Sequence, residues 1–565
     1  MIADSSPVQT GQIRTEFVAF VNSAGWKLAA CVEHAGGNLA ARPWVVLAPK
    51  YGETKKNNLQ MAYFLAANGC NVLRFDHSNH IGESEGQMED FTMTGAVDDI
   101  VACLDFLESS AGVSGVVLVS NSLSARSALR AAVCDSRIKK VVSVVGVVNL
   151  QHTLREVYKE DIFGTYLEGR HWGITDILGF DINGETFLGT AVEANLHDLK
   201  GTVEDVARLS VPLVYFFAEN DAWVDIAQVR QVLGQNPFCR LVSVAGAMHE
   251  VRENPRAAEE IFRQVAWVCW NDTACPADAE KRLQVPDKKM VLAQNKVERE
   301  RMRRSELPAQ TENDFWSGYL ERYSVLEKSN DYRQYLQDIG GMCSVRPGFT
   351  VLDAGCGNGM FGMWVLHDAV TRGLAGATMP PVYVGLDLTV RGLTDALENH
   401  DVVRRKHLAR TLRAGITPGV NYSQFDFNEL TAADSSRRLP FADGTFDVVC
   451  CSLVLSYLRQ PALLLRELYR VARPGAVFVT SSMKPHCDMS VIYRDFIEQQ
   501  VTAKELESAR DLLRAAGKIR LKEEIGHYAF YSQEELAALV NDAGFRISES
   551  RHSLGNQAVV VKAVR

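Results

Sequence analysis

The stretch GVVLVSNSLSARSALRAAV, residues 115–133, decides how the first half of this 565-residue chain folds. It begins with a short apolar run, 115–120, and continues without a break into a segment typical of a helix. At the junction, Ser122 has one small residue two places before it, Ser120, and another two places after it, Ser124. A tight strand-to-helix turn needs small side chains there, so the pattern favours a serine nucleophile, with an ordinary serine-rich helix cap as the alternative.

Short apolar segments of the same kind recur on both sides of this junction. Amphipathic segments such as 59–68 and 94–108 lie between them, and the strand candidates are 44–48, 71–75, 115–120, 141–145 and 212–217. Continuous apolar strands that alternate with helices predict a parallel sheet covered on both faces. The stretch of about 151–200 interrupts this alternation, and we expect it to form a lid.

Two further residues complete a candidate catalytic triad with Ser122. Asp221 follows the strand 212–217, and His249 follows the next apolar run, LVSVAGAMHEV. Hydrolases with a serine on such a turn keep the chain order Ser, acid, His. In this arrangement Ser122 attacks a carbonyl carbon, His249 accepts the serine proton and Asp221 orients the imidazole.

The turn 49–53 and the lid supply the other expected parts of this site. The backbone N–H groups of Leu123 and Tyr51 are the candidates for an oxyanion hole. His77 and His80 are interpreted as loop packing rather than as ligands or a base. An apolar lid face suits a fatty or polyketide acyl chain better than a sugar or a peptide, and the candidates for that face are Trp172, Ile174, Ile177, Leu178 and Phe180.

Over residues 15–270 the first half resembles the acyltransferase of bacterial bioluminescence, a thioesterase that releases a long-chain fatty acyl group from acyl carrier protein. The stretches that carry the resemblance are RFDHSNHIGESEG at 74–86, SNSLSARSALR at 120–130, VVGVVNLQHTL at 144–154 and FFAENDAWV at 216–224. The resemblance implies an α/β-hydrolase domain with a lid over an acyl tunnel. It also implies an acyl-enzyme on Ser122, with Asp221 and His249 as its partners, and acyl carrier protein as the donor of the thioester. The sequence of the lid departs from the family in detail, so the resemblance does not give the identity or the length of the acyl chain.

The second half contains a glycine-rich turn of another kind, VLDAGCGNG at 351–359, between a predicted strand and a helix. Glycines there let the backbone approach a ligand closely. Asp353 precedes the glycines, where a carboxylate would repel a pyrophosphate and favour a cationic ligand. Asp387 ends the strand candidate 382–387, in position to bind ribose hydroxyls, and Asp426 in SQFDF stands where an adenine amino group is often bound.

These motifs, together with LPFADGTFDVV at 439–449, resemble class I S-adenosyl-L-methionine-dependent methyltransferases over about 315–565. The resemblance implies a Rossmann-like domain that binds S-adenosyl-L-methionine through Asp353, Gly355, Gly357, Asp387 and Asp426. The strand candidates are 350–354, 382–387, 446–450, 477–481 and 558–562, preceded by a mainly helical stretch at 298–339. Tyr319 and Tyr323 are candidates to cover the cofactor, with helix packing as the alternative.

The methyl acceptor is less readable from the sequence. After the strand 446–450 the chain reads LVLSYL, with Ser456 and Tyr457 and no obvious general base. An acceptor that is already ionised needs no base, so this favours a carboxylate, with His486 as an alternative base.

Composition divides the chain and limits its partners. The charged stretch 272–314, with a possible solvated helix at 291–304, reads as a linker between domains at 1–271 and 315–565. The formal net charge of −9 argues against a general nucleic-acid binder, although the basic runs 296–304 and 404–413 could dock an acidic carrier protein instead of forming solvated faces. We see no secretory signal, membrane span or metal motif, and we expect a cytoplasmic protein.

The sequence therefore predicts a bifunctional thioesterase and methyltransferase. It would release an acyl chain from a carrier-protein thioester through an acyl-serine and methylate the product, with the carboxylate as one possible acceptor. In the alternative, the hydrolase half only binds the substrate or docks the carrier, and the second half methylates a hydroxyl or carbon of the bound chain. In a third reading, the halves act on unrelated small molecules.

Overall fold

The computed structural model divides into two compact units. The first comprises residues 1–304 and 520–526, and the second comprises residues 305–519 and 527–565. The structure describes residues 13–36, 42–271, 275–276, 282–302, 309–322, 326, 328–372, 381–406, 419–431, 438–488, 503–524 and 526–565.

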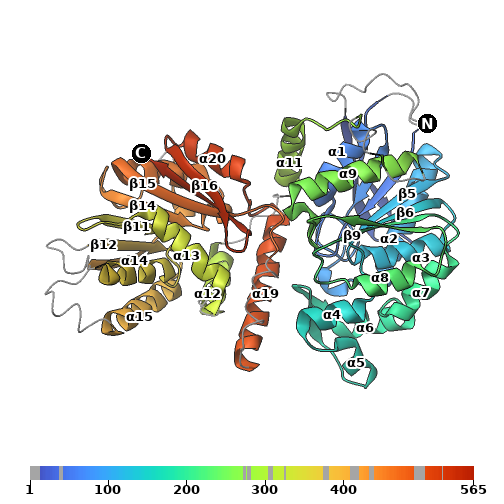
Figure 1. Ribbon diagram of the computed structural model, residues 1–565, viewed down its shortest axis with the longest axis horizontal. Coiled ribbons are helices and arrows are strands. Elements are labelled where there is room, and N and C mark those ends of the chain that lie inside the picture. The colour runs from blue at the N-terminus through green and yellow to red at the C-terminus, as the bar shows by residue number, and fades with distance from the viewer. Residues whose placement is uncertain are drawn as a thin grey trace. The chain divides into compact units, whose positions relative to one another are not determined.

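The first unit is built on an eight-stranded sheet in the order β1-β2-β4-β3-β5-β6-β9-β10 (Figure 1). From β4 to β10 neighbouring strands are parallel, while β2 pairs antiparallel with β1 and β4. The five predicted strands correspond to β3, β4, β5, β6 and β9, and the antiparallel edge was not predicted. The strands are β1 (Arg14–Val21), β2 (Lys27–His34), β3 (Trp44–Ala48), β4 (Asn71–Phe75), β5 (Val116–Asn121), β6 (Ile138–Val144), β9 (Leu213–Ala218) and β10 (Cys239–Val244).

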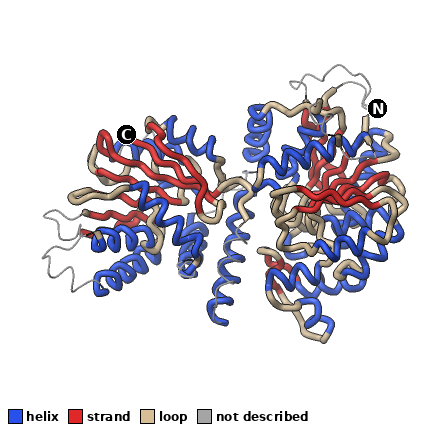
Figure 2. The backbone as a smooth tube through the Cα atoms, in the orientation of Figure 1, coloured by secondary structure: helices blue, strands red, loops and turns tan. Residues whose placement is uncertain are grey.

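Helices cover both faces of this sheet, as the strand pattern predicts (Figure 2). One face packs Val45, Val119 and Val142 against Phe64 and Ile261 of the covering helices. The helices on that face are α1 (Leu59–Ala67), α9 (Pro255–Trp270) and α11 (Lys288–Met302), and those on the other are α2 (Met93–Ala111), α3 (Ser124–Cys134), α7 (Leu199–Arg208) and α8 (Ile226–Leu233).

Helix α11 lies in the stretch read as a linker, and one of its sides is not solvated. Glu298 is 2% exposed and accepts hydrogen bonds of 2.8 and 2.6 Å from Arg74. Arg74 also donates to Glu33 from β2. The expectation of a solvated helix is therefore wrong on this side, because Glu298 satisfies a buried arginine whose position in β4 gives no hint of a distant partner.

The stretch expected to form a lid consists of α4 (Leu150–Tyr158), α5 (Ile162–Leu167), the hairpin β7–β8 (Ile174–Ile177 and Phe180–Asn183) and α6 (Gly184–Glu193). Of the five predicted inner-face residues, Ile177 and Phe180 are buried, while Ile174 is 55% exposed. Trp172 and Leu178 are half-buried. Ile174 was misplaced because it begins a two-stranded sheet whose strands face solvent on one side.

The second unit contains a seven-stranded sheet in the order β13-β12-β11-β14-β15-β17-β16, in which β17 is antiparallel to both of its neighbours. Helices α13 (Asn330–Cys343) and α14 (Met360–Thr371) pack into one apolar cluster and α17 (Pro461–Val471) and α20 (Gln533–Asp542) into another. The strands are β11 (Thr350–Ala354), β12 (Val382–Asp387), β13 (Gly419–Gln424), β14 (Phe446–Ser452), β15 (Ala472–Met483), β16 (Arg546–Ser553) and β17 (Ala558–Val564).

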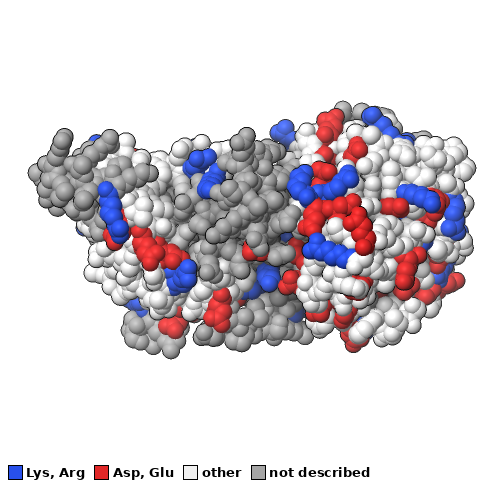
Figure 3. All heavy atoms as spheres, turned by 90° about the horizontal axis from the view of Figure 1, so that it is seen from below, with Lys and Arg blue, Asp and Glu red and all other residues white. Residues whose placement is uncertain are grey.

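The other α-helices among the described residues of this part of the chain are α12 (Ala309–Arg322), α15 (Val390–Lys406) and α19 (Ala503–Glu524). The last residues of α19 belong to the first unit. On the face shown in Figure 3, acidic and basic side chains of the described residues lie intermixed. Within the described ranges, no helix has the length and apolar character needed to cross a membrane.

Candidate functional site

Ser122 lies on a sharp turn between β5 and α3, as the sequence predicts. Its φ of 51° is in the left-handed region, which is uncommon for any residue but glycine. The Ser122 N–H donates to Val144 O at 3.0 Å, and the Val147 N–H donates to Ser122 O at 2.9 Å. Ser120 is completely buried, and the Ser124 hydroxyl donates to Pro49 O, so both neighbours must be small for this turn to form.

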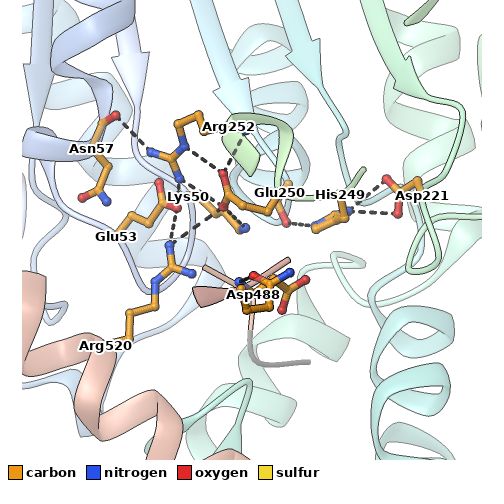
Figure 4. Close-up of polar contacts among 11 residues, drawn as sticks. Lys50, Glu53, Asn57, Asp221, His249, Glu250, Arg252, Asp488 and Arg520 are labelled. Carbon is orange, nitrogen blue, oxygen red and sulfur yellow. Dashed lines mark hydrogen bonds and ion pairs between the residues drawn. The ribbon is translucent and has the colours of Figure 1, made fainter. Parts of the chain in front are cut away.

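The three predicted triad residues come together at the carboxyl ends of the parallel strands. Ser122 Oγ lies 2.8 Å from His249 Nε2. On the other side of the ring, His249 Nδ1 lies 2.9 Å from an Asp221 carboxylate oxygen, as Figure 4 shows for these two labelled residues. The side chains of Asp221 and His249 are 0% and 4% exposed. A neutral imidazole that donates from Nδ1 to the carboxylate presents the Nε2 lone pair to the serine, which is the arrangement needed to accept its proton.

Trp223, two residues after Asp221, positions the triad and was missed in the sequence. Its ring stacks on His249 with centroids 5.0 Å apart and an interplanar angle of 10°. The backbone N–H groups of Trp223 and Val224 donate to one Asp221 carboxylate oxygen at 2.9 and 3.2 Å. The segment AENDAWV places this tryptophan next to the predicted acid, but a tryptophan at that position is equally compatible with ordinary packing, so its role could not be predicted.

The two predicted oxyanion donors stand on separate loops beside Ser122. Leu123 precedes the first turn of α3, and Tyr51 follows β3. Among the described residues, neither the Leu123 N–H nor the Tyr51 N–H has a hydrogen-bond acceptor. The neighbouring Gly52 N–H donates to His80 Nε2 at 3.0 Å, so it is already engaged, which favours Tyr51 as the second donor.

His80 is a packing residue, as predicted, but it also fixes the oxyanion loop. Burial, with help from the nearby His77, lowers the pKa of His80 to about 3. The ring is therefore neutral near pH 7 and can accept the Gly52 hydrogen bond through Nε2. The spacing of the two histidines did not reveal this role.

In the second unit, the glycine-rich turn and the carboxylates meet at the carboxyl end of the sheet. Gly355 and Gly357 have φ values of 88° and 52°, and a Cβ on Gly355 would lie 2.1 Å from Val454. Asp387 accepts a 2.8 Å hydrogen bond from the Gly357 N–H. Asp426 lies past β13, where the neighbouring Phe425 N–H donates to Asp387 O at 2.8 Å. The five predicted cofactor residues thus gather on adjacent strands.

The carboxylates at this turn are buried in a way that suits a cationic ligand. Burial, opposed by the 2.5 Å hydrogen bond from Tyr383, raises the pKa of Asp353 to about 7. Burial also raises the pKa of Asp387. A ligand that carries a positive charge would favour the ionised carboxylates, and its hydroxyl groups could donate further hydrogen bonds to them. The residues present therefore fit S-adenosyl-L-methionine.

Helix α12 lies over the glycine-rich turn, since a Cβ on Gly357 would be 3.2 Å from Leu320. Tyr319 of this helix is buried, and its ring is 5.4 Å from that of Trp316, which agrees with helix packing. Tyr323 lies outside the described residues, as does most of the basic run 404–413.

The expected acceptor residues differ in their surroundings. Ser456 is buried, and its hydroxyl is 2.8 Å from that of Ser482. Tyr457 instead joins an aromatic cluster, with ring centroids 4.6 Å from Trp316 and 4.9 Å from Tyr528. This cluster was missed because its members are spread over three distant segments. His486 follows β15 with a φ of 59°.

Comparison with known proteins relates the first half of the chain to acyl transferases and the second half to methyltransferases. A family model described as "Acyl transferase" matches residues 42–271, and one described as "Methyltransferase domain" matches residues 311–550. The chain is 30% identical over 226 residues to an acyl transferase of Photobacterium phosphoreum. The aligned stretch covers 39% of this chain and 72% of that protein. An acyl transferase of Vibrio harveyi is 29% identical over 223 residues, with coverages of 39% and 72%.

The chain therefore belongs to the acyl transferase family, and its second half carries a methyltransferase domain. Solved structures similar to the halves include an esterase from Pyrococcus furiosus, 18% identical, which covers 47% of this chain and 96% of its own with a TM-score of 0.34. A SAM-dependent methyltransferase from Aquifex aeolicus, also 18% identical, covers 43% of this chain and 97% of its own with a TM-score of 0.26. The expected fold class, an α/β-hydrolase domain followed by a Rossmann-like domain, is confirmed.

Proposed function

We propose that this protein is a bifunctional enzyme that takes an acyl chain from a carrier-protein thioester onto Ser122, releases it and methylates the product. The observation that carries the proposal is the Ser122–His249–Asp221 array, with its 2.8 and 2.9 Å contacts on a strained turn. Chemistry with a thioester needs an activated hydroxyl, and this array supplies one.

In the first step, Ser122 Oγ attacks the thioester carbonyl while His249 accepts its proton. The C–O bond to the serine forms and the C–S bond breaks, and His249 returns the proton to the leaving thiolate of the carrier. The Leu123 and Tyr51 N–H groups stabilise the negative charge on the carbonyl oxygen. In the second step, His249 takes a proton from water while the water oxygen attacks the acyl carbon. A new C–O bond forms, the C–O bond to Ser122 breaks, and His249 returns the proton to Ser122 Oγ, which frees the acid.

The second half then methylates the product. S-adenosyl-L-methionine supplies an electrophilic methyl group when bound. Asp353, Asp387 and Asp426, with the backbone at Gly355 and Gly357, bind and orient that ligand. The favoured acceptor is the freed carboxylate, because it is already ionised and needs only to be positioned. Support comes from Ser456, which is buried with its hydroxyl 2.8 Å from that of Ser482, while His486 stays the alternative base for a hydroxyl or carbon acceptor.

Mass spectrometry of the intact protein and of the products together tests both steps. Purified protein is mixed with a panel of acyl carrier-protein thioesters, with and without methyl-labelled S-adenosyl-L-methionine. We expect an acyl adduct on the wild-type chain, none on Ser122→Ala, and a free acid that gains a labelled methyl group only when the methyl donor is present.

Other outcomes separate the alternatives. If neither the thioesters nor a serine-directed fluorophosphonate modify Ser122, while a carrier-bound chain gains the methyl group, the first half is a substrate-binding or carrier-docking module. If the acid is released and never methylated, the methyl acceptor is a different molecule or an earlier, carrier-bound form of the chain.

A further inference from the structure

A group of charged residues joins two loops of the candidate acyl-transfer site. We name it the loop clamp: it consists of Lys50, Glu53, Glu250, Arg252 and Arg520 (Figure 4). Lys50 and Glu53 flank Tyr51 and Gly52, and Glu250 directly follows His249. Lys50 Nζ lies 3.0 Å from Glu250, so the clamp ties the oxyanion loop to the loop of the catalytic imidazole.

The two carboxylates of the loop clamp are buried, and the cations of the loop clamp stabilise their ionised forms. Glu53 and Glu250 are 2% and 3% exposed. Burial alone would raise the pKa of Glu250, but the charges of Arg252, Lys50 and Arg520 outweigh it and hold the pKa well below its usual range. Arg252 bridges the carboxylates: its Nε is 2.8 Å from Glu250, and its Nη2 pairs with Glu53. A buried carboxylate that loses a cation is destabilised or moves toward water.

Arg520 is the unusual member, because it comes from far along the chain. It lies in the last turns of α19, well beyond the residues 42–271 that match the acyl transferase family. Arg520 Nη2 is 2.8 Å from Glu53 and 3.9 Å from Glu250.

The end of α19 is anchored beside the clamp by its own contacts. Lys56 Nζ donates to Glu523 O at 3.2 Å, and Arg299 Nη2 lies 3.0 Å from the Glu523 carboxylate. A side chain at Gly526 would meet Arg299 O at 2.8 Å. Glu523 and Gly526 thus contact the loop after β3 and helix α11, and Arg520 lies beside Glu53.

We propose that Arg520 is a positioning residue for the reaction of Ser122, acting through Glu53 and Glu250 on the oxyanion loop and the His249 loop. This inference rests on the proposed function of the first half. Arg520 forms ion pairs with these loops, and its side chain is 26% exposed, so we expect its loss to affect the placement of the loops more than the unfolding of the unit. Displacement of a reacting group by about 1 Å can lower a rate about 100-fold.

The test compares three full-length variants. Arg520→Gln removes the charge, Arg520→Lys keeps it, and Lys518→Gln removes an exposed charge from the same helix as the matched control. Steady-state and single-turnover acylation by an acyl carrier-protein thioester give kcat and KM. Hydrogen exchange is followed in residues 49–58 and 246–254, and a melting curve checks each fold.

We expect Arg520→Gln to lower kcat by at least about 10-fold with KM changed less than about 2-fold, since the arginine aligns the reacting groups and does not bind substrate. Arg520→Lys should recover part of the loss, and Lys518→Gln should match the wild type. Exchange in both loops should rise in Arg520→Gln while the melting temperature stays within a few degrees.

Two results would overturn the inference. One is wild-type kcat and loop exchange in Arg520→Gln, and the other is an equal loss in Arg520→Gln and Arg520→Lys that follows a lowered melting temperature. Failure of the proposed function is a separate result, because then the wild-type chain itself forms no acyl adduct. The exchange measurement still decides in that case whether Arg520 holds the two loops.

Discussion

Ser122 adopts a backbone conformation that costs about 1–3 kcal/mol, and its neighbours compensate for that cost. The last residue of β6, Val144, accepts a hydrogen bond from its N–H, and Val147 in the segment after β6 donates one to its C=O. Gly146, in that segment, has no room for a side chain, since a Cβ there would lie 2.1 Å from Ser143 Oγ. The turn is therefore set by close packing on both sides, and it aims the hydroxyl at His249.

Asp221→Asn should leave the fold intact and slow acylation by about 10³–10⁴-fold. An amide can donate to His249 Nδ1, which moves the imidazole proton to Nε2 and removes the lone pair that accepts the serine proton. Single-turnover acylation measures the loss. Asp225→Asn, which changes an acid that caps α8 four residues later, is the matched control and should keep the wild-type rate. Equal rates in both variants would contradict the assigned role of Asp221.

The pKa of about 7 at Asp353 predicts a pH-dependent affinity for S-adenosyl-L-methionine. A cationic ligand binds the ionised carboxylate, so below pH 7 binding must first remove a proton. The apparent affinity should fall up to about 10-fold per pH unit between pH 7 and 5, and should level off above pH 8. Calorimetry in buffers of different ionisation enthalpy measures the proton released.

Asp353→Asn is the control for this titration. It should bind the ligand more weakly at all pH values and lose the proton release, because an amide does not ionise. A wild-type affinity that is the same at pH 6 and pH 8 would show that Asp353 is not the titrating contact.

At the scale of elements, the β7–β8 hairpin is attached to the oxyanion loop. The Tyr51 hydroxyl donates to Ile177 O at 2.9 Å, and the Phe180 ring packs against Gly52, where a Cβ would be 2.6 Å away. Leu178 and Gly179, at the tip, both have positive φ, as a two-residue hairpin turn requires. The lid and the oxyanion donor are therefore one packed structure.

Tyr51→Phe should loosen this hairpin without disturbing the core. The change removes one hydrogen bond to Ile177 O at a cost of about 1 kcal/mol, which corresponds to roughly 5-fold faster exchange of amides in residues 174–183. Tyr63→Phe removes a hydroxyl from another buried tyrosine, 3.1 Å from Thr15, and should leave the hairpin unchanged. Hydrogen exchange followed by mass spectrometry compares the two variants.

The buried ion pair between Glu298 of helix α11 and Arg74 should stabilise the first unit, although α11 lies outside the residues 42–271 that match the acyl transferase family. Glu298→Gln should lower the free energy of unfolding of the first unit by about 3 kcal/mol, the lower end for a broken buried ion pair, because Glu33 still pairs with Arg74. Glu300→Gln, whose side chain is 66% exposed, should change it by less than about 0.5 kcal/mol. Pulse proteolysis in urea, with fragments of the first unit identified by mass, measures both variants.

At the scale of the whole molecule, the first unit includes residues supplied from beyond the methyltransferase strands β11 to β15. A chain that ends at Arg304 lacks Arg520 and Glu523, so Glu53 and Lys56 each lose an ionic partner. Exchange in residues 49–58 should be faster in this shortened chain than in the full chain, because Glu53 and Lys56 lie in this segment. Equal exchange would show that residues 520–526 add nothing to the first unit.

Much of the fold followed from local sequence patterns. Valine-rich strands such as β3, β5 and β11, the Ser-Leu-Ser turn and the glycine-rich turn determine local structure, so their positions were predicted within a few residues. The antiparallel edge β1–β2 and the burial of Glu298 depend on pairing between distant segments, which no short pattern reveals. The same holds for Trp223 and His80, whose roles depend on which ring or N–H happens to be adjacent.

The chain order of the first unit also bears on its synthesis. Residues 1–304 emerge from the ribosome well before residue 520, a delay of roughly 10–40 s at ~5–20 residues per second. During that interval Glu53 and Glu250 are without Arg520, and the nascent hydrolase half would be a poor acyl-transfer catalyst. Under the proposed function, such an enzyme would withhold release of the acyl chain until residue 520, within the methyltransferase match at 311–550, has been translated.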